Sequence, residues 1–479
     1  MCSKKNQEEV EVEVDGKIVA KSGIWYALSN ILVKATAFLT TPLFTRLLTK
    51  DQYGNYSNIA SWVTIFTILT GFDAYTTVIR SKHDVGSDMN RYVSSVYLMN
   101  VLVTSIVFSI VLFFWNIFEP ILSVEKKYVY VMALYLLVLP AFNLFMTKQR
   151  AYYRYKLFAA FTVITTLLSA ILSVVFVLTF ENKLDGRVLG QYLPAIILYF
   201  FIAVCILVKG KGIKYSYISY AFKLSLPLVP HLLSLNILSS SDRIMIKNIC
   251  GAEMAALYSV DYNCVQIGNI LFDSINKAWA PWLMDALHAK EYQQIKKVSN
   301  IYFFAMLFII IGILLVGPEI IFILGGQAYT NAKWALPPLL ISCIYQVAYT
   351  MYVNVEFYLK KTGVVAGATL SAAVINLVLN VVLIPRYGFV AAAFTTLISY
   401  VALYIIHYVC LKKMKMTFIF SEKKINAALF LSLVIMFFIF CTYEIFILKL
   451  LFFIIYIGIA VCVIYKTRDK LLGFWMRRK

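Results

Sequence analysis

The sequence predicts an all-α polytopic membrane protein with about fourteen transmembrane helices. Of its 479 residues, 61% are hydrophobic and only 14% are charged, whereas an average soluble domain is about 45–50% apolar and about 25% charged. The apolar residues fall into segments of about 20 residues, each long enough to cross a hydrocarbon core of roughly 30 Å. Because lipid offers no hydrogen bonds to the backbone, such segments are predicted to be helices.

The expected spans are separated by short connections, and no soluble domain is inserted between them. They cover residues 24–48, 57–80, 92–118, 128–146, 157–180, 187–208, 223–247, 254–284, 301–324, 335–357, 364–384, 388–411, 425–443 and 445–465. A faint internal repeat, in which Arg46 and Arg243 each precede a Tyr-Ser pair, suggests two six-helix lobes. We therefore divide the chain into an N-terminal tail (1–21), a first lobe (22–208), a basic linker (209–222), a second lobe (223–411), two further helices (412–465) and a basic tail (466–479).

The net charge of +20 predicts orientation rather than a nucleic-acid partner. Most of the 44 lysine and arginine residues fall in one alternating set of connections, for example Lys148, Arg154 and Lys209, while the other set is poor in them. This alternation follows the positive-inside rule, which puts both termini of the chain in the cytoplasm. We accordingly expect a cytoplasmic membrane protein in contact with membrane lipids.

The cysteines and the head of the chain exclude other classes. The eight cysteines form no CxxC pair and lie mostly within apolar spans, so they indicate packing rather than disulfides or a metal site. Residues 8–15 are rich in acidic side chains, unlike the basic start of a signal peptide, and we expect a short cytoplasmic tail there.

Two charged residues lie deep in the first two predicted helices. Lys34 is about ten residues, or roughly 15 Å, from the start of its span, and Asp73 lies at a similar depth in the next helix. A charge inside a span costs about 2.5–3.5 kcal/mol on insertion scales, so it usually faces a cavity or a partner. Two interpretations stay open and can coexist: an ion pair that pins the helices together, or side chains that line a cavity.

The seventh and eighth predicted helices carry most of the remaining deep polarity. The seventh contains Pro227, Pro230, His231, Asn236, Ser239, Ser240, Ser241, Asp242 and Arg243. Its prolines permit a bend that can act as a hinge. His231 is a candidate proton carrier or an ordinary hydrogen-bonded histidine.

Other ionisable residues carry weaker signals. Asp242 and Arg243 are expected near the outer end of the seventh helix, where snorkelling reduces the cost of a charge. The eighth helix contains Asp261, Asp273 and Lys277, which do not share one face. We expect the residues near the ends of later spans to be interfacial; they are Glu319, Glu356, His407 and Lys449.

No enzymatic motif is found: the sequence lacks a P-loop, an HExxH zinc motif and a GxSxG elbow. The short external loops also leave little room for the catalytic acids of a membrane glycosyltransferase. The sequence therefore favours transport, driven by an ion or substrate gradient.

Four ordered stretches resemble the polysaccharide-biosynthesis flippases, the polysaccharide transporter branch of the multidrug/oligosaccharidyl-lipid/polysaccharide exporter superfamily. They are Ser29-Asn30 through Thr41-Pro42 and Arg46 to Tyr53-Gly54-Asn55-Tyr56-Ser57; Asp242-Arg243-Ile244-Met245-Ile246; Asn276-Lys277-Ala278-Trp279-Ala280-Pro281; and Lys361-Thr362 through Asn376 and Asn380 to Ile384-Pro385-Arg386-Tyr387-Gly388. The resemblance covers roughly residues 22–411.

The resemblance implies a MATE-like transporter that moves an undecaprenyl-diphosphate-linked oligosaccharide to the outer leaflet by alternating access. It also implies polysaccharide polymerase and chain-length proteins as candidate partners, for the synthesis of O-antigen, capsule or exopolysaccharide. The cations expected to offset the diphosphate charge are Lys34, Arg46, Arg80, Arg243 and Lys277. The acids available for H⁺ or Na⁺ coupling are Asp73, Asp242, Asp261 and Asp273, with His231; the candidate hinge prolines are Pro42, Pro227 and Pro230. No other cofactor is expected.

Two alternatives remain. A multidrug or metabolite antiporter of the same superfamily would bind organic cations in a cavity dominated by acids, and the deep Lys34 argues against it. A membrane-bound polymerase or glycosyltransferase would act on lipid-linked sugar even in detergent.

Overall fold

The computed structural model describes residues 16–476, and within them it contains helices and no strands. The all-α prediction is therefore confirmed. Ten helices of this described range are long and apolar enough to cross a membrane, and one sharply bent helix pair would make an eleventh. Most of the expected N-terminal tail and the last basic residues, Arg477 to Lys479, lie outside the described residues.

The chain folds into two compact units. Unit 1 comprises residues 1–259 and 365–392, and unit 2 comprises residues 260–364 and 393–479. Within unit 1, α10 (Val229–Cys250) packs along α2 (Lys50–Gly71). The division into two six-helix lobes stays a prediction.

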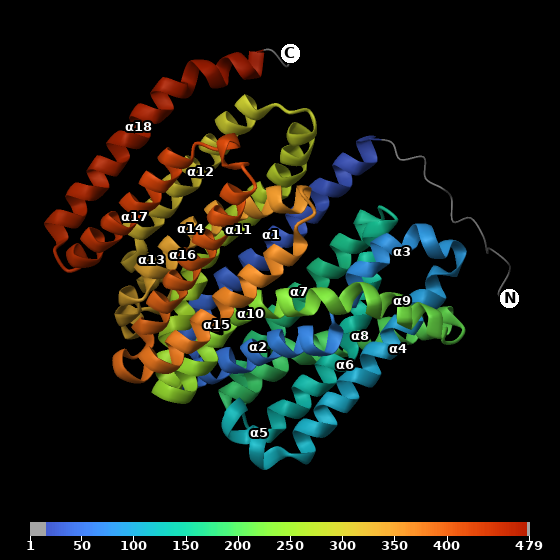
Figure 1. Ribbon diagram of the computed structural model, residues 1–479. Helices are drawn as coiled ribbons and strands as arrows, with labels where there is room; N and C mark the ends of the chain where they lie inside the picture. Colours follow the sequence, from blue (N-terminus) through green and yellow to red (C-terminus); the bar gives the residue numbers. More distant parts are fainter. Residues whose placement is uncertain (1–15, 477–479) are drawn as a thin grey trace. The chain divides into compact units, whose positions relative to one another are not determined.

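Unit 1 contains the helices that surround the candidate site (Figure 1). Besides α2 and α10 they are α1 (Gly16–Leu47), α3 (Thr77–Val85), α4 (Met89–Phe113), α5 (Trp115–Leu122), α6 (Lys126–Ala151), α7 (Tyr155–Thr179), α8 (Lys183–Gly210), α9 (Tyr215–Ser225), the first turns of α11 (Ala252–His288) and most of α15 (Thr362–Tyr387), with the 3₁₀ turns η1 (Ala74–Thr76), η2 (Gly86–Asp88) and η3 (Leu226–Leu228). The helix α1 packs mainly along α7, and α8 packs against both α6 and α7.

Unit 2 is built from the later helices. They are the remainder of α11, α12 (Tyr292–Leu315), α13 (Gly317–Gly325), α14 (Leu336–Tyr358), α16 (Phe389–Lys413), α17 (Glu422–Thr442) and α18 (Phe446–Met476), with η4 (Gln327–Trp334) and η5 (Thr417–Ile419). The helices α17 and α18 lie side by side (Figure 1). The side chains of α14 are almost all buried, so α14 forms the centre of this unit.

The predicted seventh helix, 223–247, tightens into a 3₁₀ turn where its prolines lie, within one span from Tyr215 to Cys250. The chain leaves α9 at Ser225, makes the 3₁₀ turn η3 around Pro227, and enters α10, in which Pro230 occupies a first-turn position. Proline lacks a backbone N–H and so removes a hydrogen bond from a helix interior, whereas it fits the first turn of a helix, which explains the 3₁₀ turn at these prolines. Pro42, by contrast, lies inside α1, which remains one helix.

Candidate binding cavity

The second predicted helix, 57–80, is not continuous as expected, because it breaks at Asp73. The helix α2 ends at Gly71, Phe72 and Asp73 adopt left-handed φ angles of 49° and 53°, and the chain resumes through η1 into α3. The axes on either side differ by 56°. Two successive left-handed residues cannot continue a right-handed helix, and Asp is one of the few side chains that enters this region readily.

The backbone groups released by the break have new partners. Asn100 of α4 donates its amide N–H to the Gly71 carbonyl oxygen at 3.1 Å. The Thr76 hydroxyl donates to the Asp73 carbonyl oxygen at 2.8 Å, and the Thr77 hydroxyl donates to the Ala74 carbonyl oxygen at 2.5 Å. Non-helical backbone at membrane depth is stable only where other protein groups or a water-filled cavity make hydrogen bonds to its N–H and C=O groups. Because such partners are present here, the break is a stable part of the fold.

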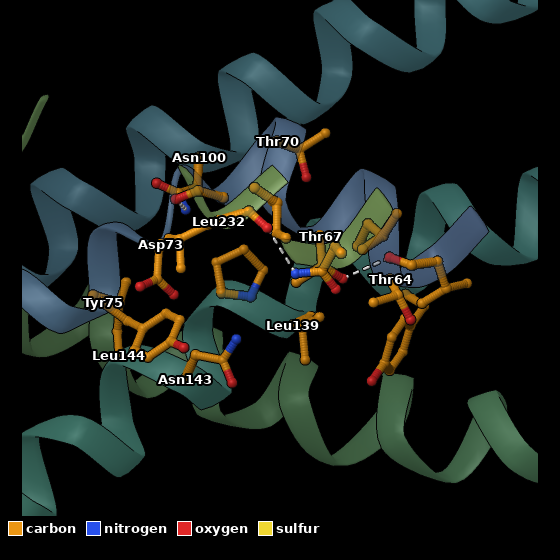
Figure 2. Close-up of a pocket in the computed structure, with 17 residues that line it drawn as sticks. Thr64, Thr67, Thr70, Asp73, Tyr75, Asn100, Leu139, Asn143, Leu144 and Leu232 are labelled. Atoms are coloured by element: carbon orange, nitrogen blue, oxygen red, sulfur yellow. Dashed lines mark hydrogen bonds between the residues drawn. The ribbon is translucent and has the colours of Figure 1, made fainter. Parts of the chain in front are cut away.

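The break opens onto a cavity of about 460 Å³ within unit 1 (Figure 2). Its walls come from α2, the unwound segment, α4, α6 and α10. The polar lining residues are Thr64, Thr67, Thr70, Asp73, Tyr75, Asn100, Tyr135, Asn143 and Asn236. The apolar ones are Val63, Ile68, Leu136, Leu139, Pro140, Leu144 and Leu232.

Polar side chains gather at both ends of this cavity. Asp73, Tyr75 and Asn143 lie close together at one end, and the hydroxyls of Thr64 and Thr67 lie toward the other (Figure 2). Among the lining residues of the described chain, Asp73 alone carries a formal charge. The cavity therefore offers amides, hydroxyls, aromatic faces and one carboxylate, and no cation.

Of the two interpretations left open for Lys34 and Asp73, the ion pair is not formed among the described residues. The side chain beside the Asp73 carboxylate is that of Tyr75, which follows it in the unwound segment. Lys34 is half-buried in α1 and does not line the cavity. The physical reason is the packing of α1, which lies against α7 and only touches α2.

None of the other expected cations lines this cavity either. Arg46 and Arg80 are exposed in unit 1, and Lys277 is exposed in unit 2. Arg243 is half-buried and donates to the Ser239 carbonyl oxygen, one turn earlier in its own helix, at 3.3 Å.

The polar face of α10 is largely used to bind α15. His231 Nδ1 lies 2.8 Å from the Thr369 hydroxyl, and Asn380 donates to Asp242 Oδ1 at 2.7 Å. Tyr258, at the start of α11, donates to the other Asp242 oxygen at 2.5 Å. Asp242 is only 1% exposed, so the expectation that it snorkels at a helix end is wrong.

The acids of unit 2 lie outside the cavity, and two of them are fully buried. Asp261 is fully buried in α11, and neither of its carboxylate oxygens has a hydrogen-bond partner among the described residues. Asp273, three turns further along the same helix, is half-buried. Glu356 and His407, expected at the interface, are both fully buried and hydrogen-bonded to each other.

Several residues that line the cavity were not predicted from the sequence. Tyr75, Tyr135 and Asn143 have no charge, and aromatic or amide side chains in an apolar span ordinarily belong to the packing. One signal was available: Asn143 follows Pro140 by three residues inside an otherwise apolar span. An amide that close to a helix-perturbing proline is a sign of a polar environment.

The fold and the cavity together define a polytopic membrane transporter, in which a broken helix lines a polar site between spans. Comparison with known proteins narrows this class. The family model for polysaccharide biosynthesis proteins matches residues 19–287, and the chain belongs to that family. The resemblance seen in the sequence motifs is thereby confirmed.

Two relatives agree with this assignment. The chain is 22% identical over 369 residues to the Lsg locus putative protein 1 of Haemophilus influenzae, which covers 74% of this chain and 89% of that protein. It is 36% identical over 121 residues to the probable low-salt glycan biosynthesis flippase Agl15 of Haloferax volcanii, covering 24% of this chain and 26% of that one.

Solved structures show the same fold. The lipid II flippase MurJ, in an inward closed conformation, matches with a TM-score of 0.65 at 14% identity, over 94% of this chain and all of that one. An inward-facing multidrug resistance MATE transporter matches with a TM-score of 0.55 at 13% identity, over 81% of this chain and 99% of that one. The likeness concerns the fold, which is that of a membrane transporter.

Proposed function

We propose that this protein flips a lipid-linked oligosaccharide, carried on undecaprenyl diphosphate, from the inner to the outer leaflet of the cytoplasmic membrane for surface polysaccharide synthesis. Membership of the polysaccharide biosynthesis family supports this, as does a relative named as a glycan biosynthesis flippase. In this proposal both termini are cytoplasmic, and a polysaccharide polymerase and chain-length proteins take the product further.

The cavity at the broken helix is the observation that carries the proposal. Its volume of about 460 Å³ lies within the range of roughly 300–1,000 Å³ common for small-molecule sites. Sugar hydroxyls both donate and accept hydrogen bonds, and the lining supplies three asparagine amides, three threonine hydroxyls and the Asp73 carboxylate. Tyr75 and Tyr135 add apolar faces against which a sugar ring can pack.

None of the described residues that line the cavity is a cation. The diphosphate must therefore be bound by another part of the protein. A charge stripped of water costs several kcal/mol even after relaxation, so a nearby cation is required. Lys34 is the candidate we retain for this role. Two negative charges that move outward through an inside-negative potential gain about 4–5 kcal/mol per 100 mV, provided that no counter-ion accompanies them.

The cavity is tested by export in a strain that lacks the gene. We expect Asn143→Leu to abolish surface polysaccharide and to leave the lipid-linked unit inside the cell, at unchanged membrane protein level. The matched control is Asn116→Leu, because Asn116 is an exposed asparagine of α5. Normal export by the Asn143 variant would remove the cavity from the mechanism.

Lys34 is tested separately. Lys34→Ala is expected to stop export while the protein still inserts, and Lys34→Arg is expected to retain part of it, since the charge is kept. Full export by the alanine variant would show that Lys34 takes no part.

One observation favours a second candidate, a cation-coupled multidrug or metabolite antiporter. Asp73 is the charged group of the cavity, and a carboxylate in a wet pocket can hold an organic cation or exchange H⁺ or Na⁺. Ethidium efflux from a drug-sensitive host discriminates between the two. Efflux that Asp73→Asn abolishes would support the antiporter; restored polysaccharide without efflux supports the flippase.

A further inference from the structure

A second pocket in unit 1 has three cations and no acid among the described residues that line it. Its volume is about 260 Å³, and it lies where α4, α6, α7 and α8 meet. The residues that line it are Asn90, Val93, Phe145, Lys148, Gln149, Arg154, Leu157, Cys205, Ile206 and Lys209. It shares no lining residue with the larger cavity.

The pocket lies where a lipid-facing surface meets a cationic end of the helices. Leu157 is 44% exposed on its rim, and Phe201 and Val208, on the same helix as Lys209, are 62% and 70% exposed. Exposed apolar surface on a membrane-spanning helix contacts acyl chains. The cations beside it belong to the connections that the positive-inside rule assigns to the cytoplasm. In the orientation proposed above, the pocket therefore lies at the depth of the inner-leaflet headgroups.

Two of these cations, Lys148 and Arg154, contact neutral groups around the pocket. Lys148 Nζ donates to the Asn90 side-chain oxygen at 2.6 Å. The Lys148 ammonium and the Arg154 guanidinium lie 5.8 Å and 6.0 Å from the centroid of the same ring, that of Tyr152. Cations gathered in this way repel one another, and a bound anion relieves that repulsion.

The pocket also contains a buried hydrogen-bond acceptor, the side-chain oxygen of Gln149. Gln149 is only 4% exposed, and its Oε1 has no hydrogen-bond partner among the described residues. A buried acceptor left without a partner is unfavourable, and a ligand hydroxyl next to the phosphate would supply that partner.

We propose that this pocket is a binding site for the phosphate headgroup of an inner-leaflet lipid. Lys148, Arg154 and Lys209 bind the phosphate, and Gln149 accepts a hydrogen bond from a headgroup hydroxyl. The acyl chains lie along the exposed face of α8. This site is separate from the transport cavity, and it would anchor unit 1 to one leaflet through a single ordered lipid.

The competing explanation is a diffuse attraction of anionic lipid to any basic surface. The test therefore compares two variants that each lose three positive charges, one inside the pocket and one outside it. Full-length protein in neutral detergent is titrated with phosphatidylglycerol or phosphatidylcholine, and bound lipid is counted by native mass spectrometry. The pocket variant combines Lys148→Gln, Arg154→Gln and Lys209→Gln. The control combines Lys156→Gln, Lys211→Gln and Lys223→Gln, three exposed lysines of unit 1 that do not line the pocket.

We expect the wild type and the control to bind one phosphatidylglycerol in preference to phosphatidylcholine. The pocket variant should bind it at least about tenfold more weakly. Cys205→Trp, which fills the pocket and changes no charge, should weaken it as well, while Lys209→Arg should retain it. Equal losses in the pocket and control variants, or full binding by Cys205→Trp, would overturn the proposal.

Competition identifies the source of the phosphate. Displacement of phosphatidylglycerol by undecaprenyl phosphate at equal or lower concentration would assign the site to the polyprenyl carrier. Retention of phosphatidylglycerol would assign it to a bilayer lipid. Both outcomes support a lipid phosphate site, whereas binding of inorganic phosphate with the same affinity as the lipids would overturn it.

Discussion

His407 Nδ1 lies 2.8 Å from Glu356 Oε2, and both side chains are fully buried in unit 2. The pair joins α16 to α14, and the ring of Tyr349 stacks on the imidazole at a centroid distance of 5.8 Å. Within the described chain, Glu356 Oε1 and His407 Nε2 have no hydrogen-bond partner. The contact between the two residues is therefore what compensates for their burial.

Removing one member of this pair should destabilise the protein more than removing both. Glu356→Leu leaves the imidazole buried without its partner, which costs about 1–3 kcal/mol or more. The double variant Glu356→Leu with His407→Phe should recover most of that loss, because no polar group remains stranded. Thermal unfolding in detergent measures both.

The control for these single and double variants is an ion pair of the same unit that lies at the protein surface. Lys333 lies 3.2 Å from Glu444, whose side chain is 67% exposed, and such pairs contribute less than about 1 kcal/mol. Glu444→Leu should therefore change the unfolding temperature little. Losses that simply add in the Glu356 and His407 double variant would contradict a coupled pair.

Asn100 is predicted to hold the broken helix open. Asn100→Leu removes the donor to the Gly71 carbonyl oxygen, which lies 3.1 Å away, and should lower stability by about 1–3 kcal/mol. Export should fall as well, because the unwound segment carries Asp73 into the cavity. If the variant melts and exports like wild type, the Gly71 carbonyl has found another partner.

Gly190 is predicted to be irreplaceable at the crossing of α7 and α8. A Cβ on this residue would lie 2.3 Å from the Ser173 Cα, so the helices would have to separate. Small residues permit such close helix approach in membranes. Gly190→Ala should reduce folded protein in the membrane sharply, as judged by size-exclusion chromatography.

Gly367→Ala is the matched control for Gly190→Ala. No atom lies within 4 Å of a Cβ built on Gly367, and alanine favours a helix over glycine by up to about 1 kcal/mol. This variant should be as stable as wild type or more so. A comparable loss in both variants would mean that close packing at Gly190 is not the cause.

Arg187 is predicted to require its guanidinium. It is 8% exposed, and its guanidinium carbon lies 3.8 Å from the centroid of the Phe44 ring and 4.2 Å from that of Tyr56. Its Nη1 also donates to the Ser173 hydroxyl at 2.7 Å. A lysine cannot stack as a flat group between two rings, so Arg187→Lys should cost about 2 kcal/mol.

The unfolding temperature of Arg187→Lys is to be compared with that of Arg386→Lys, which alters an exposed arginine of unit 1. The second variant should behave like wild type. An Arg187→Lys protein of unchanged stability would show that charge alone suffices between α1, α2 and α8.

The sequence predicted the site in part. Asp73 and Asn236 were singled out as polar groups deep in apolar spans, and both line the cavity. The rule behind that prediction is local, because a polar group in lipid needs a partner wherever it lies. Asn143 and Tyr75 were missed, since an uncharged side chain carries too small a penalty to stand out in one sequence.

By itself, the sequence determined that this is an all-helical membrane protein and, through the order of its motifs, to which family it belongs. Hydropathy and backbone satisfaction act within a single span, so they can be read residue by residue. Only the tertiary structure decided which partner each polar face meets. Lys34 lies apart from Asp73 because α1 packs on α7, and Asp242 is buried because α10 meets α15.

The same distinction applies to the break at Asp73 and to the pair of Glu356 and His407. The hydrophobic effect contributes little to the association of helices in lipid, so close packing and hydrogen bonds determine which helices contact one another. Those contacts join residues far apart in the chain: Asn100 stabilises the break at Gly71, and His407 compensates Glu356. No local pattern in the sequence encodes them.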